Sequence, residues 1–165
     1  MSLRPALFLA AALALAGCHR KEITTHERDE AANLVSEANF AVTIREWSRA
    51  EGLYTKAVKI CPDSGDYWLD LGVVRMHLND RGGARSAYKS AIDAYKDDLG
   101  LHPASSQPVI RSAYALVILG RPDEARSLVE KARSKNPDDR TLKAFVENRG
   151  LDLVIADPAL KSISP

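Results

Sequence analysis

Histidine is the side chain best suited to acid–base or metal chemistry near neutral pH, and this chain contains four of them. His26 and Glu30 are four residues apart and would meet on one face of a helix, but a catalytic zinc site needs three protein ligands. An exposed ion pair is therefore the favoured interpretation of that pair. His77 falls at an expected helix end, where the helix dipole accounts for it. His19 and His102 fall in an expected linker and an expected loop.

The remaining polar motifs also have structural explanations. Asp80-Arg81-Gly82-Gly83 indicates a tight turn between two helices, not a phosphate-binding loop. The acid pairs Asp97-Asp98 and Asp138-Asp139 fall at helix ends or turns, where solvation or capping explains them. Cys61 lies in an apolar helix end without a neighbouring base or second cysteine, so we expect a small buried hydrophobic residue there. We therefore predict that the protein is not an enzyme and holds no metal and no cofactor.

The N-terminal segment has the organisation of a secretory signal peptide. Arg4 and the amino terminus form a positive region, and an uninterrupted apolar run covers residues 6–16. These eleven residues, as a helix, reach about half of a ~30 Å hydrocarbon core, which makes the run a poor membrane span. Leu15-Ala16-Gly17-Cys18 resembles the lipobox of bacterial lipoproteins, in which a peptidase cleaves before a lipid-modified cysteine. The alternative is an ordinary signal peptide followed by an unrelated cysteine.

The lipobox resemblance implies where in the cell the protein is located. Residues 1–17 would be removed, and Cys18 would carry acyl chains such as palmitate that hold the protein to a membrane. The mature chain would then be anchored in the bacterial cell envelope and would face the periplasm. An aspartate after the cysteine signals inner-membrane retention in enteric lipoproteins. His19 stands at that position, which favours the outer membrane.

The composition is that of a globular domain with balanced charge. The chain has 165 residues, 45% of them hydrophobic, which excludes a disordered or collagen-like chain and favours a single domain. Lys and Arg number 23 against 22 Asp and Glu, for a net charge of +1. Nucleic-acid binding needs a clustered basic face, so we expect no nucleic-acid partner.

The body of the chain repeats itself. From Glu27 onward the apolar residues follow helical spacing, and no strand is predicted. Five positions recur first after 34 residues and then after a further 41: Leu34, Ala38, Ala50, Tyr54 and Ala57; Trp68, Gly72, Ala84, Tyr88 and Ala91; Val109, Ala113, Ala125, Val129 and Ala132. Small residues let two helix axes approach within about 8–10 Å, so each unit is expected to be an antiparallel helix pair. The alternative is an irregular helical bundle with chance alanines.

The repeated residues resemble the tetratricopeptide repeat, or TPR, family. The middle unit carries Trp68-x2-Leu71-Gly72 and Ala84-x3-Tyr88, and Pro62 and Pro137 end the first and third units. Arg75 stands where the pattern has Tyr, and the outer two units lack the Trp. The resemblance covers Ala31 to about Asp139. It implies an all-α fold, a right-handed superhelical stack of about three TPR hairpins closed by a C-terminal capping helix.

We expect the following organisation: a signal peptide over 1–17, a linker over 18–26, a TPR domain over 27–149 and a tail over 150–165. Within the domain the repeats cover about 31–64, 65–98 and 106–139, and the cap covers 139–149. The middle repeat's second helix is expected to end near Leu99. The apolar tail should lie against the last helices, with only its final residues disordered.

Stacked TPR hairpins imply a concave groove that binds a protein or peptide. Transferred onto this chain, its lining residues are Val35, Asn39, Val42, Leu69, Val73, Met76, His77, Ile110, Arg111 and Tyr114. Packing between helices is the alternative for the apolar ones, above all for Leu69. The carboxylate clamp of chaperone-cofactor TPR proteins is not expected, because only Asn39 and Arg111 match it and Asp70 would repel a carboxylate.

The expected function is that of a membrane-anchored periplasmic adaptor for a protein partner, in envelope assembly or secretion. Two alternatives stay open. One is a small-ligand-binding or enzymatic accessory protein that uses the groove and the 97–108 loop, which clustered groups with perturbed pKa values would favour. The other is a structural part that self-assembles through the ends of the stack. No oligomeric state is predicted.

Overall fold

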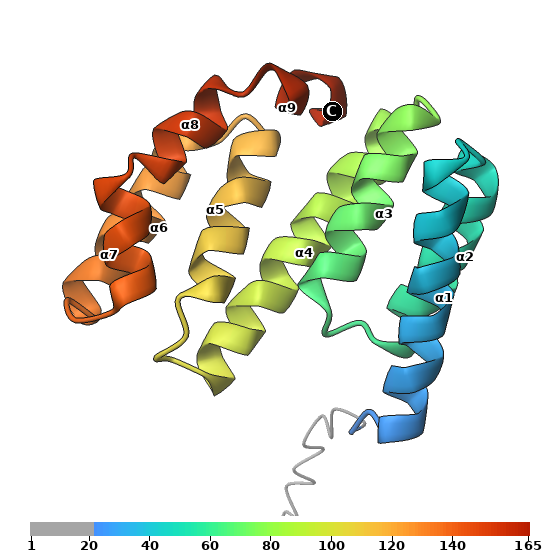
Figure 1. Cartoon of the computed structure of the whole chain (residues 1–165), viewed down its shortest axis with the longest axis horizontal. Coiled ribbons are helices and arrows are strands. Elements are labelled where there is room, and N and C mark those ends of the chain that lie inside the picture. Colours follow the sequence, from blue (N-terminus) through green and yellow to red (C-terminus); the bar gives the residue numbers. More distant parts are fainter. Residues whose placement is uncertain (1–21) are drawn as a thin grey trace, which may run out of the picture.

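The computed structural model describes residues 22–165, and within this range the chain is all-α. The helices in the described range are α1 (Thr25–Thr43), α2 (Trp47–Ile60), α3 (Gly65–His77), α4 (Arg81–Leu101), α5 (Gln107–Ile118), α6 (Pro122–Lys135), α7 (Arg140–Glu147), α8 (Gly150–Ala156) and α9 (Pro158–Ile163). Sequential helices pack as antiparallel pairs, α1 with α2, α3 with α4 and α5 with α6 (Figure 1). The expected all-α class and pairing are confirmed for this part of the chain.

The three hairpins turn in the same way at equivalent positions. Each turn has one residue in the left-handed region, Arg45 (φ 60°), Asn79 (φ 61°) and Gly120 (φ 72°). These residues are spaced by the same 34 and 41 positions that relate the repeated residues in the sequence. The backbone N–H of each donates to a carbonyl three residues earlier, on Val42, Met76 and Val117. The repeat register therefore appears in the backbone as well as in the side chains.

Small residues lie where the paired helices touch. Ala38 on α1 and Ala113 on α5 are fully buried. Gly72 on α3 lies so close to the ring of Tyr88 on α4 that a Cβ at this position would overlap the ring. Gly65, two turns earlier on α3, faces Tyr95 in the same way. Two glycines on one helix thus accommodate two tyrosines of its partner, which brings α3 and α4 into close contact.

Side-chain caps define several helix starts. Thr24 and Glu27 form a reciprocal capping box at α1, so this helix begins at Thr25, inside the expected linker of residues 18–26. Asp80 caps α4 and accepts from the backbone N–H of Gly83, so Asp80-Arg81-Gly82-Gly83, expected as the turn between two helices, is the cap and first turn of α4 instead. Asp139 caps α7 through the N–H of Leu142, at the position where the capping helix was expected. The second helix of the middle pair continues through Gly100 to Leu101, beyond the expected end at Leu99.

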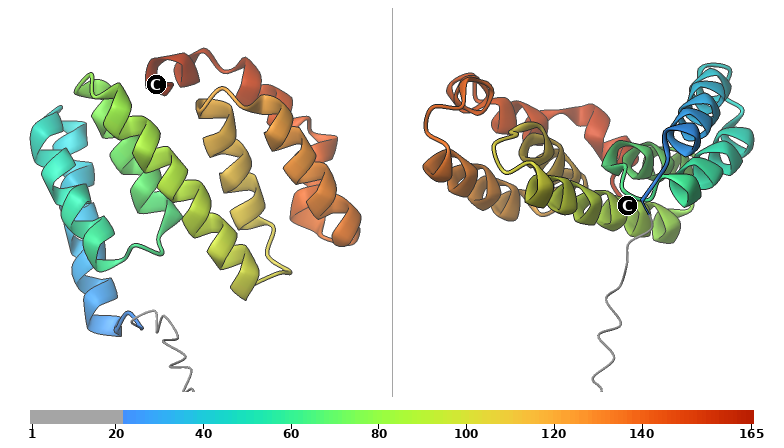
Figure 2. Two further views of the ribbon diagram at one scale, coloured as in Figure 1. Left: turned by 180° about the vertical axis from the view of Figure 1, so that it is seen from behind. Right: turned by 90° about the horizontal axis from the view of Figure 1, so that it is seen from below.

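The paired helices form two layers, and the C-terminal helices return across one of them. The view from behind in Figure 2 brings α2, α4 and α6 to the front, while α1, α3 and α5 face the viewer in Figure 1. Seen from below, both ends of the array of helices, at α1 and at α7, curve toward the side that carries α1, α3 and α5 (Figure 2). We use the term inner face for the surface formed by the side chains of these three helices.

The tail reaches the second hairpin, whereas the sequence predicts contact with the last helices only. Residues 150–165 form α8, which packs against α5, α6 and α7, and α9, which continues to α3 and α5. The final residue makes a contact as well, because the Arg85 guanidinium donates to the main-chain oxygen of Pro165 at 3.0 Å. Disorder of the last residues stays a prediction.

The predicted signal peptide (1–17) and lipid-bearing Cys18 lie outside the described residues. Within residues 22–165, none of the helices combines the length and the hydropathy that a membrane span requires.

Candidate functional site

The first hairpin contributes a mixed polar and apolar part of the inner face. Val35 and Val42 are half-buried on α1 and pack against the core of this hairpin. Asn39 lies between them on the same helix and is exposed. Its side-chain oxygen accepts a hydrogen bond from the hydroxyl of Tyr54 on α2 at 2.5 Å. Three expected site residues therefore share one face of α1.

Charged residues of α3 and α5 meet next to this part. The hydroxyl of Tyr95 on α4 donates to Asp66 Oδ1 at 2.6 Å, and Arg111 Nε on α5 lies 3.6 Å from the same oxygen. Asp70 follows Asp66 by one helical turn and is half-buried. Both aspartates thus lie near the start of α3 and close to Arg111, which among residues 22–165 is the one base that shifts the pKa of Asp70.

Asp70 is the most perturbed carboxyl of the inner face. Burial, and secondly the charge of Asp66, raise the pKa of Asp70 to about 6, while Arg111 acts in the opposite direction. Among the described residues, no hydrogen bond or ion pair reaches its carboxyl group. A half-buried carboxylate without a donor is energetically costly, and a ligand that brings a cation or an N–H group would relieve that cost.

Helix α9 lies against part of the inner face, where it contacts α3 and α5. Val73, Met76, Ile110 and Tyr114 are half-buried and pack against the core cluster that contains Leu160 of α9. Leu69 is only 6% exposed and belongs to this core, so the structure favours the packing alternative for this residue. These positions are therefore arranged together, as the sequence predicts, but α9 lies over part of them.

His77 faces a different surface. Its ring stacks on Trp47 at the start of α2, with centroids 4.0 Å apart and ring planes 7° from parallel. The contact connects the end of α3 to the preceding hairpin, which gives this residue a packing role next to the inner face.

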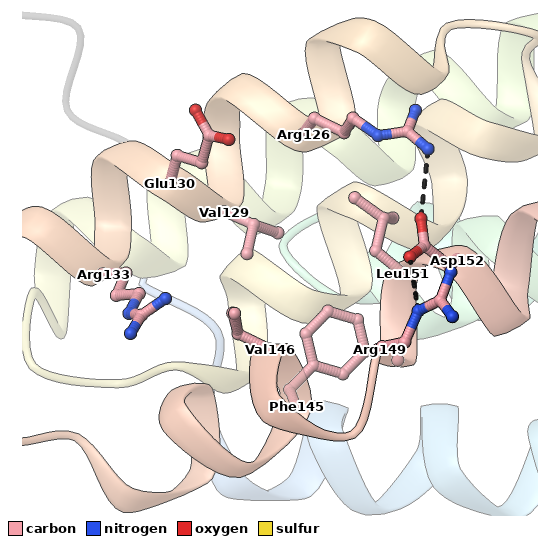
Figure 3. Close-up of a pocket in the computed structure, with 10 residues that line it drawn as sticks. Arg126, Val129, Glu130, Arg133, Phe145, Val146, Arg149, Leu151 and Asp152 are labelled. Carbon is pink, nitrogen blue, oxygen red and sulfur yellow. Dashed lines mark hydrogen bonds and ion pairs between the residues drawn. The ribbon is translucent and has the colours of Figure 1, made fainter.

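Away from the inner face, a hollow lies between α6, α7 and α8 (Figure 3). It has a volume of about 240 Å³ and an apolar lining that includes Val129, Phe145 and Leu151. At its rim Asp152 is paired with both Arg126 and Arg149, each at 3.1 Å, and these hydrogen bonds lower its pKa. Ligand sites usually measure about 300–1,000 Å³, and the carboxylate at this rim is already paired with two guanidinium groups. We assign no ligand to this hollow.

Cys61 lies in the core, as expected. It is 2% exposed and unpaired, and burial raises the pKa of its thiol. Both properties disfavour the reactive thiolate. Within residues 22–165, no three His, Cys, Asp or Glu side chains converge on a point that could hold a metal ion.

Two features of the inner face are absent from the sequence interpretation. The first is the proximity of Asp66 and Asp70 to Arg111, since the sequence assigns Asp70 and Arg111 to the groove only individually. The spacing of the two aspartates, one helical turn apart, is the signal that could have indicated it. The second is α9, whose Leu160 and Ile163 have the i, i+3 spacing of an amphipathic helix.

Comparison with protein-family models gives no match for this sequence.

Proposed function

We propose that this chain is a lipid-anchored TPR adaptor of the bacterial envelope, which faces the periplasm and binds a protein segment on its inner face. The lipid would be carried by Cys18. The right-handed superhelix of TPR proteins belongs to this proposal, as does a location at the outer membrane.

The repeated hairpin turn at Arg45, Asn79 and Gly120 is the observation that carries the proposal. Equivalent turns at the repeat spacing support an arrangement in which α1, α3 and α5 lie on the same side of the molecule (Figure 1). Helical-repeat proteins use such a surface to bind extended or helical segments of other proteins.

The chemistry of the inner face indicates what such a segment would bring. Val35 and Val42 supply apolar contacts on α1, and Asp66 and Asp70 supply two carboxylates against the single base Arg111. A segment with an apolar side chain next to a lysine or arginine complements this arrangement, because the cation would compensate the carboxylate of Asp70.

The raised pKa of Asp70 also favours the second candidate, a receptor for a small cationic ligand. The segment 97–108, expected as a loop that contributes to the site, does not supply a comparable group. Residues 97–101 lie within α4, and His102 Nδ1 pairs with Asp98 at 2.8 Å on the exposed surface.

Site-specific photocrosslinking in intact envelopes tests the proposal. A photoreactive residue replaces Arg111 on the inner face in one variant and Arg49 on α2 in the control. Both arginine side chains are 52% exposed and each forms one ion pair, so the two positions are matched in these respects. We expect a protein adduct from position 111 and none from position 49.

The role of charge is tested in the same experiment. Asp70→Asn should reduce the adduct at position 111, whereas Asp93→Asn, at an exposed position of α4, should leave it unchanged. Equal adducts at positions 111 and 49 would contradict binding on the inner face. A missing adduct, together with a small cation found on the chain by native mass spectrometry, would favour the second candidate.

A further inference from the structure

The C-terminal segment, residues 157–165, packs as a short helix against two helices of the inner face. Helix α9 contacts α3 and α5, which belong to different hairpins (Figure 1). Leu160 is 5% exposed and joins the core cluster that includes Leu116 and Ile118 of α5. Ile163, one turn later, packs half-buried against the same cluster. The segment therefore makes the type of contact expected of a helical ligand with aliphatic residues at i and i+3.

Polar groups of α4 hold the end of this segment. The hydroxyl of Tyr88 donates to the carbonyl oxygen of Ile163 at 2.8 Å. Ile163 is the last residue of α9, and the last carbonyls of a helix have no partner within the helix. The Arg85 guanidinium donates to the main-chain oxygen of Pro165 at 3.0 Å. Tyr88 and Arg85 thus bind the C-terminal end of a short helix, where the helix dipole also favours a cation.

The repeat shows that the hydroxyl of Tyr88 lacks a partner of its own. Tyr54 occupies the equivalent position in the first hairpin, and its hydroxyl donates to Asn39. The residue 34 positions after Asn39 is Val73, which cannot accept a hydrogen bond. In the second hairpin the backbone of the C-terminal segment replaces the missing asparagine. Tyr88 is therefore arranged to receive a carbonyl from outside its own hairpin.

We infer that the C-terminal segment is an internal occupant of a binding site on α3, α4 and α5, and that a partner helix of the same chemistry displaces it. The inference deepens the proposed function, on which it rests, by naming the partner segment: a short helix with two aliphatic residues at i and i+3 and free carbonyls at its C-terminal end. The internal segment lowers the affinity for that partner, because the site is available only while the segment is released.

Binding of a labelled synthetic peptide of residues 156–165 to the full-length chain tests this inference. Leu160→Asp with Ile163→Asp should release the internal segment by placing carboxylates against the core. Ala159→Asp with Ser162→Asp is the control, because it adds the same two negative charges at two exposed positions of the same helix. Fluorescence anisotropy should show the peptide bound about tenfold or more tightly by the released variant than by the control or the wild type.

Tyr88→Phe supplies a readout that general loosening of the fold would not change. In the released variant it should weaken peptide binding roughly three- to tenfold, the effect of one hydrogen bond. Tyr54→Phe removes the equivalent hydroxyl of the first hairpin and should leave peptide binding unchanged.

Each outcome decides for or against the inference. A released variant that is folded by circular dichroism and binds the peptide no better than the control overturns it. If the released variant unfolds, Leu160→Ala is measured in the same way, and unfolding of this milder variant shows that the segment is an integral part of the core and overturns the inference. Wild-type dimers that dissociate on peptide addition would identify a second copy as the occupant and overturn the assignment to a partner. Because the assay uses purified chain and synthetic peptide, its failure leaves crosslinking at position 111 as a separate test of the proposed function.

Discussion

Phe40 on α1 and Val74 on α3 occupy the same repeat position, 34 residues apart, but their surroundings differ completely. Val74 is 2% exposed and packs in a cluster with Ala50, Tyr54 and Val58 of α2. Phe40 is 60% exposed, because in the described chain no hairpin precedes α1 to cover it. The first hairpin thus presents at its outer end the surface that every later hairpin buries.

This relationship predicts a contrast in stability. Val74→Ala should lower the free energy of unfolding by roughly 1.5–3 kcal/mol, since it removes buried methyl groups and leaves a cavity. Phe40→Ala removes a larger side chain but should change the free energy by no more than about 0.5 kcal/mol, because that side chain is mostly in water. Urea unfolding followed by circular dichroism measures both. A large loss for Phe40→Ala would mean that another part of the chain or a second copy covers this end.

Contact between α3 and α4 depends on small residues. Ala84 is fully buried, so Ala84→Leu would insert three additional carbon atoms between helices that already touch. Overpacking of this kind typically costs ~1–3 kcal/mol. Lys89→Ala, at an exposed position of the same helix, should cost no more than about 0.5 kcal/mol. Equal urea midpoints for the two variants would contradict the repeat register.

The raised pKa of Asp70 predicts a pH-dependent effect on stability. In the unfolded chain this carboxyl group has its ordinary pKa near 3.8, and in the folded chain its pKa is about 6. Between these values the folded state holds more protons than the unfolded state, so stability falls as the pH rises through this window. Asp70→Asn should abolish the loss and make the protein more stable than the wild type at pH 8, by roughly 1–3 kcal/mol.

Urea unfolding at pH 4 and pH 8 measures this effect. At pH 4 the two proteins should differ much less, because Asp70 is then largely protonated in the folded state. Asp93→Asn, at an exposed position, should change the unfolding free energy by no more than about 0.5 kcal/mol at either pH. If the difference in unfolding free energy between the wild type and Asp70→Asn is the same at pH 4 and pH 8, burial does not penalise the ionised form of Asp70.

The lipobox resemblance predicts how the N-terminus is processed. Mass spectrometry of the mature protein from membranes should find an N-terminal, acylated Cys18. Cys18→Ala should leave an unlipidated precursor that is not processed at this site, because only a thiol can form the thioether. Cys61→Ala is the control, and it should leave lipidation intact. A mature N-terminus elsewhere, without a lipid, would contradict the anchor.

The helices, their pairing and the small contact residues could be predicted from the sequence. Each depends on a local pattern: the spacing of apolar residues, the cap at Asp139, and the recurrence of Ala38 as Gly72 and Ala113. Local patterns act over a few residues and repeat with the chain, so one sequence reveals them. The helix bounds were less certain, since the start of α1 and the end of α4 depend on capping and packing at single residues.

The position of α9 and the properties of Asp70 were decided by tertiary structure alone. Residues 150–165 lie outside the repeat register, and an aliphatic segment of this kind could pack on any apolar surface within its reach. Only in the folded chain do Val73 and Tyr88 leave a hydroxyl free for the carbonyl of Ile163. The pKa of Asp70 likewise depends on burial between helices and on the nearby charge of Asp66. Both effects arise from groups brought together in space, and the linear order of residues does not contain those distances.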